Sequence, residues 1–284
     1  MADTTIEWTD ITWNPTTGCD RISSGCDNCY ALTMARRLKG MGSAKYVNDG
    51  DPRTSGPGFG LTVHPDTLND PFTWAKPRKV FVNSMSDLFH ARVPVEFIAS
   101  VWQTMAATPK HTFQILTKRP ERLARVLGQV HERLDLVEPL RNVWLGTSVE
   151  SADYIRRVDH LREAPAAIRF ISAEPLIGPL GDLNLTGIDW VIVGGESGTG
   201  ARPMHPDWAR DLRDRCTAAG VAFHFKQWGA HRWVAGSRFN AETSCWEDHG
   251  IEAQRVSKKL SGRELDGRTW DEFPADVPVP AGPR

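Results

Sequence analysis

Seven short apolar segments, each followed by small or polar residues, constrain the fold of this chain more than any other feature of its sequence. They lie at residues 7–13, 79–82, 112–116, 143–145, 168–171, 190–193 and 222–225. Short apolar runs are typical of parallel strands that are buried on both faces. The small and polar residues that follow them are expected at the carboxyl ends of the strands, where β/α barrels build their sites.

Amphipathic helical patterns between these segments predict the class of the fold. Residues 30–39 repeat apolar side chains at helical spacing, and residues 206–219 form a second predicted helix. Further helices are expected around residues 98–105 and 120–130. Strands that alternate with helices indicate an α/β protein. We therefore predict a partial (β/α) barrel of about six or seven units, with the site at the C-terminal ends of the strands.

The organisation of the chain follows from where this alternation stops. Residues 1–229 carry the barrel pattern, with a cysteine loop at 18–30 and an inserted loop at 42–78 that is rich in Gly, Pro, Asp and Thr. From about residue 230 a polar segment without clear periodicity takes over. We interpret residues 230–284 as a C-terminal appendage packed on the mouth of the barrel and not as a second domain.

Charge and hydropathy exclude some classes of protein. The net charge is −1 and the pI is about 6.8, which argues against a uniformly basic nucleic-acid coat but leaves room for a local basic groove. No apolar run is long enough to span a membrane. The first ten residues lack the basic and apolar regions of a signal peptide. A cytoplasmic protein without a membrane segment is expected.

Three of the five cysteines form a C-x6-C-x2-C motif at Cys19, Cys26 and Cys29. In a reducing compartment such a cluster indicates metal or redox chemistry and not a disulfide framework. Three thiolates bind three irons of a four-iron four-sulfur cluster and leave the fourth iron open to a small ligand. The glycines before Cys19 and Cys26 are expected to let the backbone approach the metal. The alternative is a zinc site in which a histidine, with His64 and His90 as candidates, or a distant cysteine supplies the fourth ligand.

Eight segments spread over nearly the whole chain carry a resemblance to a known family. They are TWNPTTGCDRISSGCDNCYA, SMSDLFH, LTKRPERL, GTSVE, SAEPLIGPL, WVIVGGESGTGARP, FKQWG and LDGRTWDEFP. These segments resemble a phage-associated family of uncharacterised bacterial proteins with a three-cysteine motif. That family is in turn similar to radical S-adenosylmethionine enzymes. The usual cysteine spacing in those enzymes is C-x3-C-x2-C, whereas the first gap here is six residues.

The resemblance implies a second cofactor, S-adenosylmethionine, which binds the open iron, and an electron donor that reduces the cluster. The residues expected to hold the cofactor follow the predicted strands. They are Ser84, Ser86 and Asp87 at the amino group, Lys118 or Arg119 at the carboxylate, Ser148 and Glu150 at the ribose, and Gly194, Gly195 and Glu196 near the adenosyl part.

Basic and aromatic residues in the loops at the expected mouth indicate the class of substrate. The residues expected to contact it are Arg119, Glu174, Arg202, Lys226 and Trp228. A basic and aromatic rim around a cavity suits a nucleic-acid strand with one base drawn inward. We therefore expect a radical enzyme that modifies or repairs nucleic acid, and the resemblance to phage-associated proteins favours DNA.

Two other functions also fit the sequence. The first is a nucleic-acid-binding or nuclease protein with a structural cluster, in which the mouth acids bind a catalytic metal ion. These acids are Asp87, Glu150, Glu174 and Glu196. The second is a radical enzyme that acts on a peptide or a small molecule. Cofactor cleavage separates both radical enzymes from the nuclease, and binding to DNA separates the two radical enzymes from each other.

Overall fold

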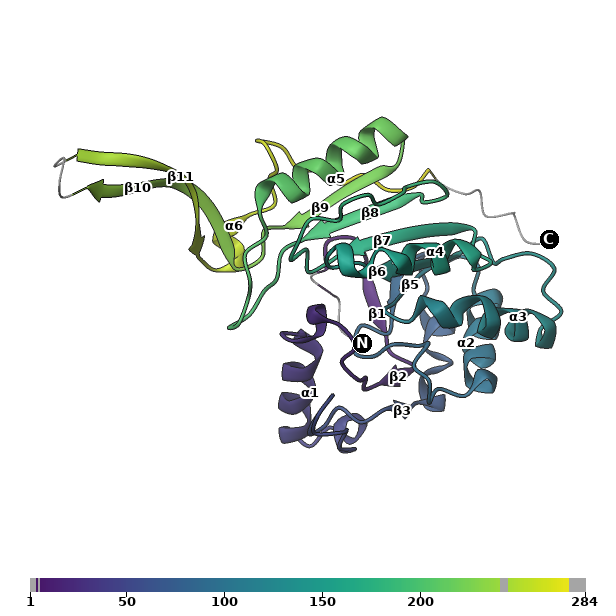
Figure 1. Cartoon of the computed structure of the whole chain (residues 1–284). Helices are drawn as coiled ribbons and strands as arrows, with labels where there is room; N and C mark the ends of the chain where they lie inside the picture. Colours follow the sequence, from purple (N-terminus) through teal and green to yellow (C-terminus); the bar gives the residue numbers. More distant parts are fainter. Residues whose placement is uncertain (1–3, 5, 241–244, 276–284) are drawn as a thin grey trace.

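A single parallel sheet organises the chain (Figure 1). The computed structural model describes residues 4, 6–240 and 245–275, without the side chains of residues 236–249. Seven parallel strands pair in the spatial order β1-β4-β5-β6-β7-β8-β9. Their bounds are Ile11–Trp13, Lys79–Val82, Thr112–Thr117, Val143–Ser148, Ile168–Ala173, Trp190–Gly194 and Ala222–Gln227. Because β1 and β9 are the two edges, the curved sheet is an open, partial β/α barrel, as the sequence predicts.

Four helices cover the outer face of the sheet (Figure 1). They are α2 (Val95–Ala107), α3 (Leu123–Arg133), α4 (Arg156–Glu163) and α5 (Pro206–Ala219). Their apolar faces and the outward residues of the strands form the main core, in which Val101, Leu127, Val193 and Phe223 are buried. The short helix α4 is not evident in the sequence pattern. The β7–β8 connection, residues 174–189, contains no helix, so the alternation is incomplete there.

Aromatic side chains fill the inner face near the amino ends of the strands. Successive strand residues point to opposite faces, so Phe81, Phe170 and Trp190 point inward while their neighbours face the helices. Trp8 packs among them, with its ring centroid 4.7 Å from that of Phe81 and 6.2 Å from that of Trp190. This aromatic plug closes the lower part of the barrel. The space above it, at the carboxyl ends of the strands, is left for a cavity.

The cysteine loop and the long loop after it form a separate layer beside the edge strand β1. Helix α1 (Tyr30–Gly40) packs through Ala31 and Ala35 on Tyr46, Phe59 and Met85. The long loop contains only short elements. They are β3 (Thr62–Val63), which pairs with β2 (Thr16–Thr17) ahead of the cysteine loop, and the 3-10 turns Ala44–Tyr46, Pro65–Thr67 and Asp70–Thr73. Further 3-10 turns lie at Ser24–Cys26, Pro120–Arg122 and Ala152–Tyr154.

The C-terminal part consists of a β-hairpin and of a segment, residues 256–275, that we call the C-terminal strap. Strands β10 (His231–Asn240) and β11 (Cys245–Arg255) pair antiparallel and extend away from the barrel (Figure 1). After α6 (Lys258–Ser261) the chain runs along β9, where the amide of Phe225 donates to the carbonyl of Trp270. The boundary at residue 229 stays a prediction. The outer half of the hairpin lies away from the mouth, whereas its base contacts the β8–α5 loop through Arg255.

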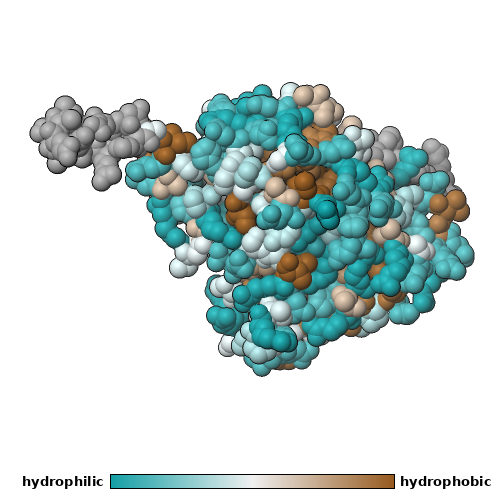
Figure 2. Space-filling view, viewed as in Figure 1, coloured by the Kyte–Doolittle hydropathy of each residue, from teal (hydrophilic) through white to brown (hydrophobic). Residues whose placement is uncertain are grey.

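On the face shown in Figure 2, hydrophobic residues form small groups among hydrophilic ones. No helix within the described residues is both long and apolar enough to cross a bilayer.

Substitutions at two glycines can test the packing of the barrel. A Cβ atom at Gly146 on β6 would lie 2.4 Å from the ring of Phe170, whereas one at Gly128 on α3 would meet nothing within 4 Å. We expect Gly146→Ala to lower the free energy of unfolding by about 1–3 kcal/mol, because it overpacks the plug. Gly128→Ala should raise it by about 0.5–1 kcal/mol, because alanine is the better helix former. Urea unfolding of both variants measures this, and a change of the same sign in both would contradict the packing described.

Candidate cofactor and substrate site

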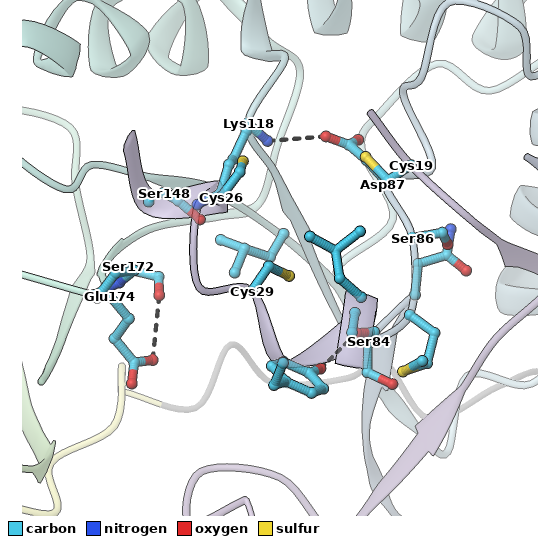
Figure 3. A pocket seen from close by; sticks show the side chains of 18 of the residues that line it. Cys19, Cys26, Cys29, Ser84, Ser86, Asp87, Lys118, Ser148, Ser172 and Glu174 are labelled. Carbon is cyan, nitrogen blue, oxygen red and sulfur yellow. Dashed lines mark hydrogen bonds between the residues drawn. The ribbon is translucent and has the colours of Figure 1, made fainter. Parts of the chain in front are cut away.

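One cavity of about 790 Å³ lies at the carboxyl ends of the strands, above the aromatic plug. Trp8 and Phe81 form part of its floor. Thirteen of the residues predicted for the site line it: Cys19, Cys26, Cys29, Ser84, Ser86, Asp87, Lys118, Arg119, Ser148, Glu174, Gly195, Glu196 and Lys226. In the view of Figure 3, Ser172 and Glu174 lie on one side of Cys29, and Ser84, Ser86 and Asp87 lie on the other.

The three cysteines of the motif line this cavity. None of them forms a disulfide. Cys26 ends a 3-10 turn and Cys29 is the N-cap of α1, so the loop turns each thiol toward the cavity just before a helix start. Burial raises the pKa of Cys19 to about 12 and also raises that of Cys29. A four-iron cluster with one open iron needs three thiolates, and three unpaired thiols line this cavity, so the residues present fit this group.

The histidines considered for a zinc site are engaged elsewhere. The ring nitrogen Nε2 of His64 lies 2.8 Å from the hydroxyl of Thr17, and that of His90 lies 2.8 Å from Oδ2 of Asp20. Neither histidine lines the cavity. Among the described residues, no three His, Cys, Asp or Glu side chains are grouped as ligands of a single metal ion. Thiolates that bind different irons of one cluster lie farther apart than ligands of a single ion.

Glu150 anchors the first half of the cysteine loop. It is fully buried, and its Oε1 accepts from the hydroxyl of Ser23 at 2.8 Å. The same oxygen lies 2.6 Å from Nζ of Lys118, while Oε2 lies 2.8 Å from Nη1 of Arg157. Burial opposes the charge, but the two cations hold the pKa of Glu150 below its usual value. Because Glu150 does not line the cavity, its position suits anchoring of the loop and not contact with a ribose.

Gly25 lies against this anchor. A Cβ atom at Gly25 would lie 2.5 Å from Oε1 of Glu150. The glycine before Cys26 therefore makes room for a protein carboxylate, where the sequence suggested room for the metal.

Glu196 and Arg202 clamp the second half of the cysteine loop. The guanidinium of Arg202 donates to both oxygens of Glu196, at 2.6 and 2.9 Å, and to the carbonyl of Ser24 at 2.8 Å. The side-chain amide of Asn28 donates to Oε2 of Glu196 at 3.1 Å. Although burial opposes it, these hydrogen bonds hold the pKa of Glu196 below its usual value. The β8–α5 loop is thus fastened to the loop that carries the thiols.

Asp87 and Arg119 approach Cys19 from the other side. Nη1 of Arg119 lies 3.3 Å from Sγ of Cys19 and 3.1 Å from Oδ2 of Asp87. Asp87 also accepts from the hydroxyl of Thr117 at 2.7 Å and from the amide of Lys118 at 3.0 Å. Its carboxylate is therefore occupied by protein donors. Arg119, which the sequence suggested for a ligand or substrate, lies beside a thiol instead.

A second polar wall is formed by the ends of β7, β8 and β9. Glu174 accepts from the hydroxyl of Ser172 at 3.3 Å, and its Oε1 lies 3.0 Å from Nζ of Lys226. Gln227 donates to the hydroxyl of Ser197 at 3.2 Å, while its buried Oε1 has no hydrogen-bond partner among the described residues. The sequence analysis missed Gln227, although it lies in the FKQWG segment directly after the predicted strand.

The remaining predicted residues contact other protein groups. Ser84 donates to Asn14 at 3.2 Å, and Ser86 donates to the carbonyl of Thr16 at 2.8 Å. Trp228 does not line the cavity; its indole donates to the carbonyl of Glu264 at 2.8 Å and its ring packs on Phe225. Added Cβ atoms at Gly194 and Gly195 would collide with Glu174 and with the carbonyl of Trp228. These glycines therefore permit close packing between strand ends.

The mouth acids do not gather as ligands of a catalytic metal ion. Each lies within 3.1 Å of a lysine or arginine nitrogen: Asp87 with Arg119, Glu150 with Lys118 and Arg157, Glu174 with Lys226, and Glu196 with Arg202. The nuclease interpretation, in which these four acids bind a metal together, receives no support from this arrangement.

The fold and the site together define a partial β/α barrel with a thiol-lined cavity at its mouth. The chain belongs to the family described as "Protein of unknown function (DUF5131)", whose model matches residues 3–274. The association of this family with phages stays a prediction.

Comparisons with individual proteins find only distant likenesses. No curated protein sequence matches the chain. Among solved structures, a spore photoproduct lyase mutant is 13% identical, with a TM-score of 0.48, covering 93% of this chain and 73% of its own. A spore photoproduct lyase complexed with dinucleoside spore photoproduct is 12% identical, with a TM-score of 0.41, covering 86% and 68%.

The clamp on the cysteine loop can be tested in the protein without cofactors. Glu196→Ala removes the acceptor of Arg202 and Asn28, so we expect amide hydrogens of residues 24–29 to exchange faster. Hydrogen bonds to a charged group contribute about 1.5–3 kcal/mol, and protection should fall by a similar amount. Hydrogen-exchange mass spectrometry measures this, with the exposed Glu132→Ala on α3 as the control. Unchanged exchange at residues 24–29 in Glu196→Ala would rule out the clamp.

Proposed function

We propose that this protein is an iron–sulfur enzyme of the radical S-adenosylmethionine type that acts on nucleic acid. The observation that carries the proposal is the set of three free thiols, Cys19, Cys26 and Cys29, that line a cavity at the carboxyl ends of parallel strands. The resemblance of eight sequence segments to a three-cysteine family supports the same chemistry. The three cysteines would bind a four-iron cluster and leave one iron open.

The cavity offers room and polar groups for a second cofactor beside the thiols. A four-iron cluster with S-adenosylmethionine supplies a 5′-deoxyadenosyl radical, which abstracts hydrogen from a substrate. Side chains of Ser84, Ser148 and Lys118 line the cavity near the cysteine loop, where they would orient the cofactor. We assign Glu150, Glu196 and the Asp87–Arg119 pair a different task, because their contacts hold the cysteine loop and its thiols in place.

The wall formed by β7, β8 and β9 would receive the substrate. Its charged pair Glu174–Lys226 and the side-chain amide of Gln227 would offer donors and acceptors to a polar ring edge. The aromatic floor at Trp8 and Phe81 offers an apolar surface for the ring face. A cavity of this size accommodates a cofactor and one further group. A base drawn out of a nucleic-acid strand has this combination of a polar edge and an apolar face.

The cluster can be tested by its iron content. Anaerobically purified protein should be brown and contain about four irons per chain, as one four-iron cluster requires. Cys19→Ala, Cys26→Ala and Cys29→Ala should each lose the colour, because each removes a ligand. Cys216→Ala should retain it, since Cys216 is buried in α5 within the main core. Stoichiometric zinc in place of iron would overturn the proposal.

Cofactor chemistry is a separate prediction. Under a strong reductant the iron-loaded protein should convert S-adenosylmethionine to 5′-deoxyadenosine, and Cys29→Ala should not. Chromatography of the products measures this. If the iron-loaded, reduced protein neither binds nor cleaves S-adenosylmethionine, the result would favour a cluster with a structural role.

Gln227 provides a test of the substrate wall. Gln227→Leu should lower stability by no more than about 0.5–1.5 kcal/mol, because it removes only the hydrogen bond to the hydroxyl of Ser197. Binding of a single-stranded oligonucleotide of mixed sequence should weaken by about 0.5–1.5 kcal/mol, the contribution of one neutral hydrogen bond. Fluorescence anisotropy at fixed salt measures this, with the exposed Gln129→Leu on α3 as the matched control. Equal affinity of the two variants would remove Gln227 from the substrate wall, and no affinity in the unaltered protein would argue for a peptide or a small molecule.

A further inference from the structure

We infer that Arg119 is a positioning residue that raises the reduction potential of the cluster through its hydrogen bond to Cys19. This inference rests on the proposed function, because it requires that Cys19 bind a cluster. Beyond that function, it assigns Arg119 to the electron-transfer step and not to the binding of cofactor carboxylate or substrate.

The guanidinium of Arg119 is held in one place by three contacts. Nη1 lies 3.3 Å from Sγ of Cys19 and 3.1 Å from Oδ2 of Asp87. Nη2 donates to the carbonyl of Asp20 at 3.0 Å. The whole residue is only 7% exposed. A planar guanidinium with donors in a rigid fork satisfies these acceptors together, which a lysine ammonium would not reproduce.

The surrounding residues fix this arrangement further. Asp87 accepts from Thr117, from the amide of Lys118 and from the amide of Phe89 at 3.0 Å, so its carboxylate cannot turn away from Arg119. Asp20, next to Cys19, is in contact with His90 and Arg92 at the surface of the loop. Both the donor and the sulfur acceptor are therefore positioned by the protein alone.

The hydrogen bond is specific to one thiol. Within the described part of the chain, Arg119 is the one cationic side chain that donates to a cysteine sulfur, whereas Cys26 lies 3.6 Å from the neutral hydroxyl of Ser23. Hydrogen bonds to the sulfurs and the net charge around a cluster set its potential. Reduction adds negative charge to the cluster. A buried donor with a positive charge at Cys19 stabilises that added charge, so it makes reduction easier.

The charge of Asp87 acts in the opposite direction. Asp87 lies on the far side of the same guanidinium and repels added negative charge. Its removal should therefore favour reduction, provided Arg119 stays on Cys19 through its contact with Asp20. The two residues give opposite predictions for the same measured quantity, which a general disturbance of the site would not produce.

The experiment is a potentiometric titration of the anaerobically loaded protein, followed by electron paramagnetic resonance of the reduced cluster. Arg119→Gln should lower the midpoint potential by at least about 59 mV, a tenfold change in a one-electron equilibrium. Arg119→Lys should lower it by less, since the charge remains. Asp87→Asn should raise it. Arg92→Gln, which loses only an exposed contact with Asp20, is the control and should leave it unchanged.

The outcomes separate this inference from the function on which it rests. Iron-free unaltered protein would overturn the proposed function. If the iron-loaded protein cleaves the cofactor but Arg119→Gln has the same midpoint potential as the unaltered protein, the inference is overturned and the proposed function stands. If Arg119→Gln fails to assemble a cluster, Asp87→Asn decides: a raised potential supports the inference, and an unchanged or lowered one overturns it.

Discussion

The buried carboxylate of Glu150 is the contact on which the candidate site depends most. It joins the ends of β5 and β6, helix α4 and the cysteine loop through Lys118, Arg157 and Ser23. Loss of one partner of a buried ion pair costs about 3–5 kcal/mol, because the other charge is left without compensation. The cysteine loop contains no long helix or strand of its own, so its conformation relies on such contacts. Glu150 and Glu196 therefore hold this polar loop in one conformation.

The barrel provides a fixed frame for this loop. Parallel strands bring their carboxyl ends to one edge, so residues far apart in the chain meet without any local sequence signal. The aromatic plug fills the inner face below the cavity, where Trp8, Phe81 and Phe170 pack together. The frame thus brings the thiols and the Glu174–Lys226 pair to one cavity.

The barrel can be predicted well from the sequence, because apolar runs and helical spacing are local patterns. All seven strands and helix α5 lie where apolar runs and helical spacing indicate them, and thirteen predicted site residues meet around one cavity. Helix α4 is too short for a clear period, and the hairpin of β10 and β11 has no alternation of apolar residues that would reveal it. The orientation of a side chain depends on its partner in space. The sequence therefore suggests a stacking role for Trp228, although its indole donates a hydrogen bond to the C-terminal strap.

The mouth acids are paired with lysine and arginine side chains, and this pairing changes the role that we assign to them. Conspicuous carboxylates at strand ends suggest ligand contacts, but Asp87, Glu150 and Glu196 are each saturated by protein donors. Their directional ion pairs specify one position for the cysteine loop, which apolar packing of the same loop would specify less sharply. Recognition of cofactor and substrate is then left to the groups that still have unused capacity. These are the serine hydroxyls at the cysteine side of the cavity and, at the other side, Glu174, Lys226 and the side-chain amide of Gln227.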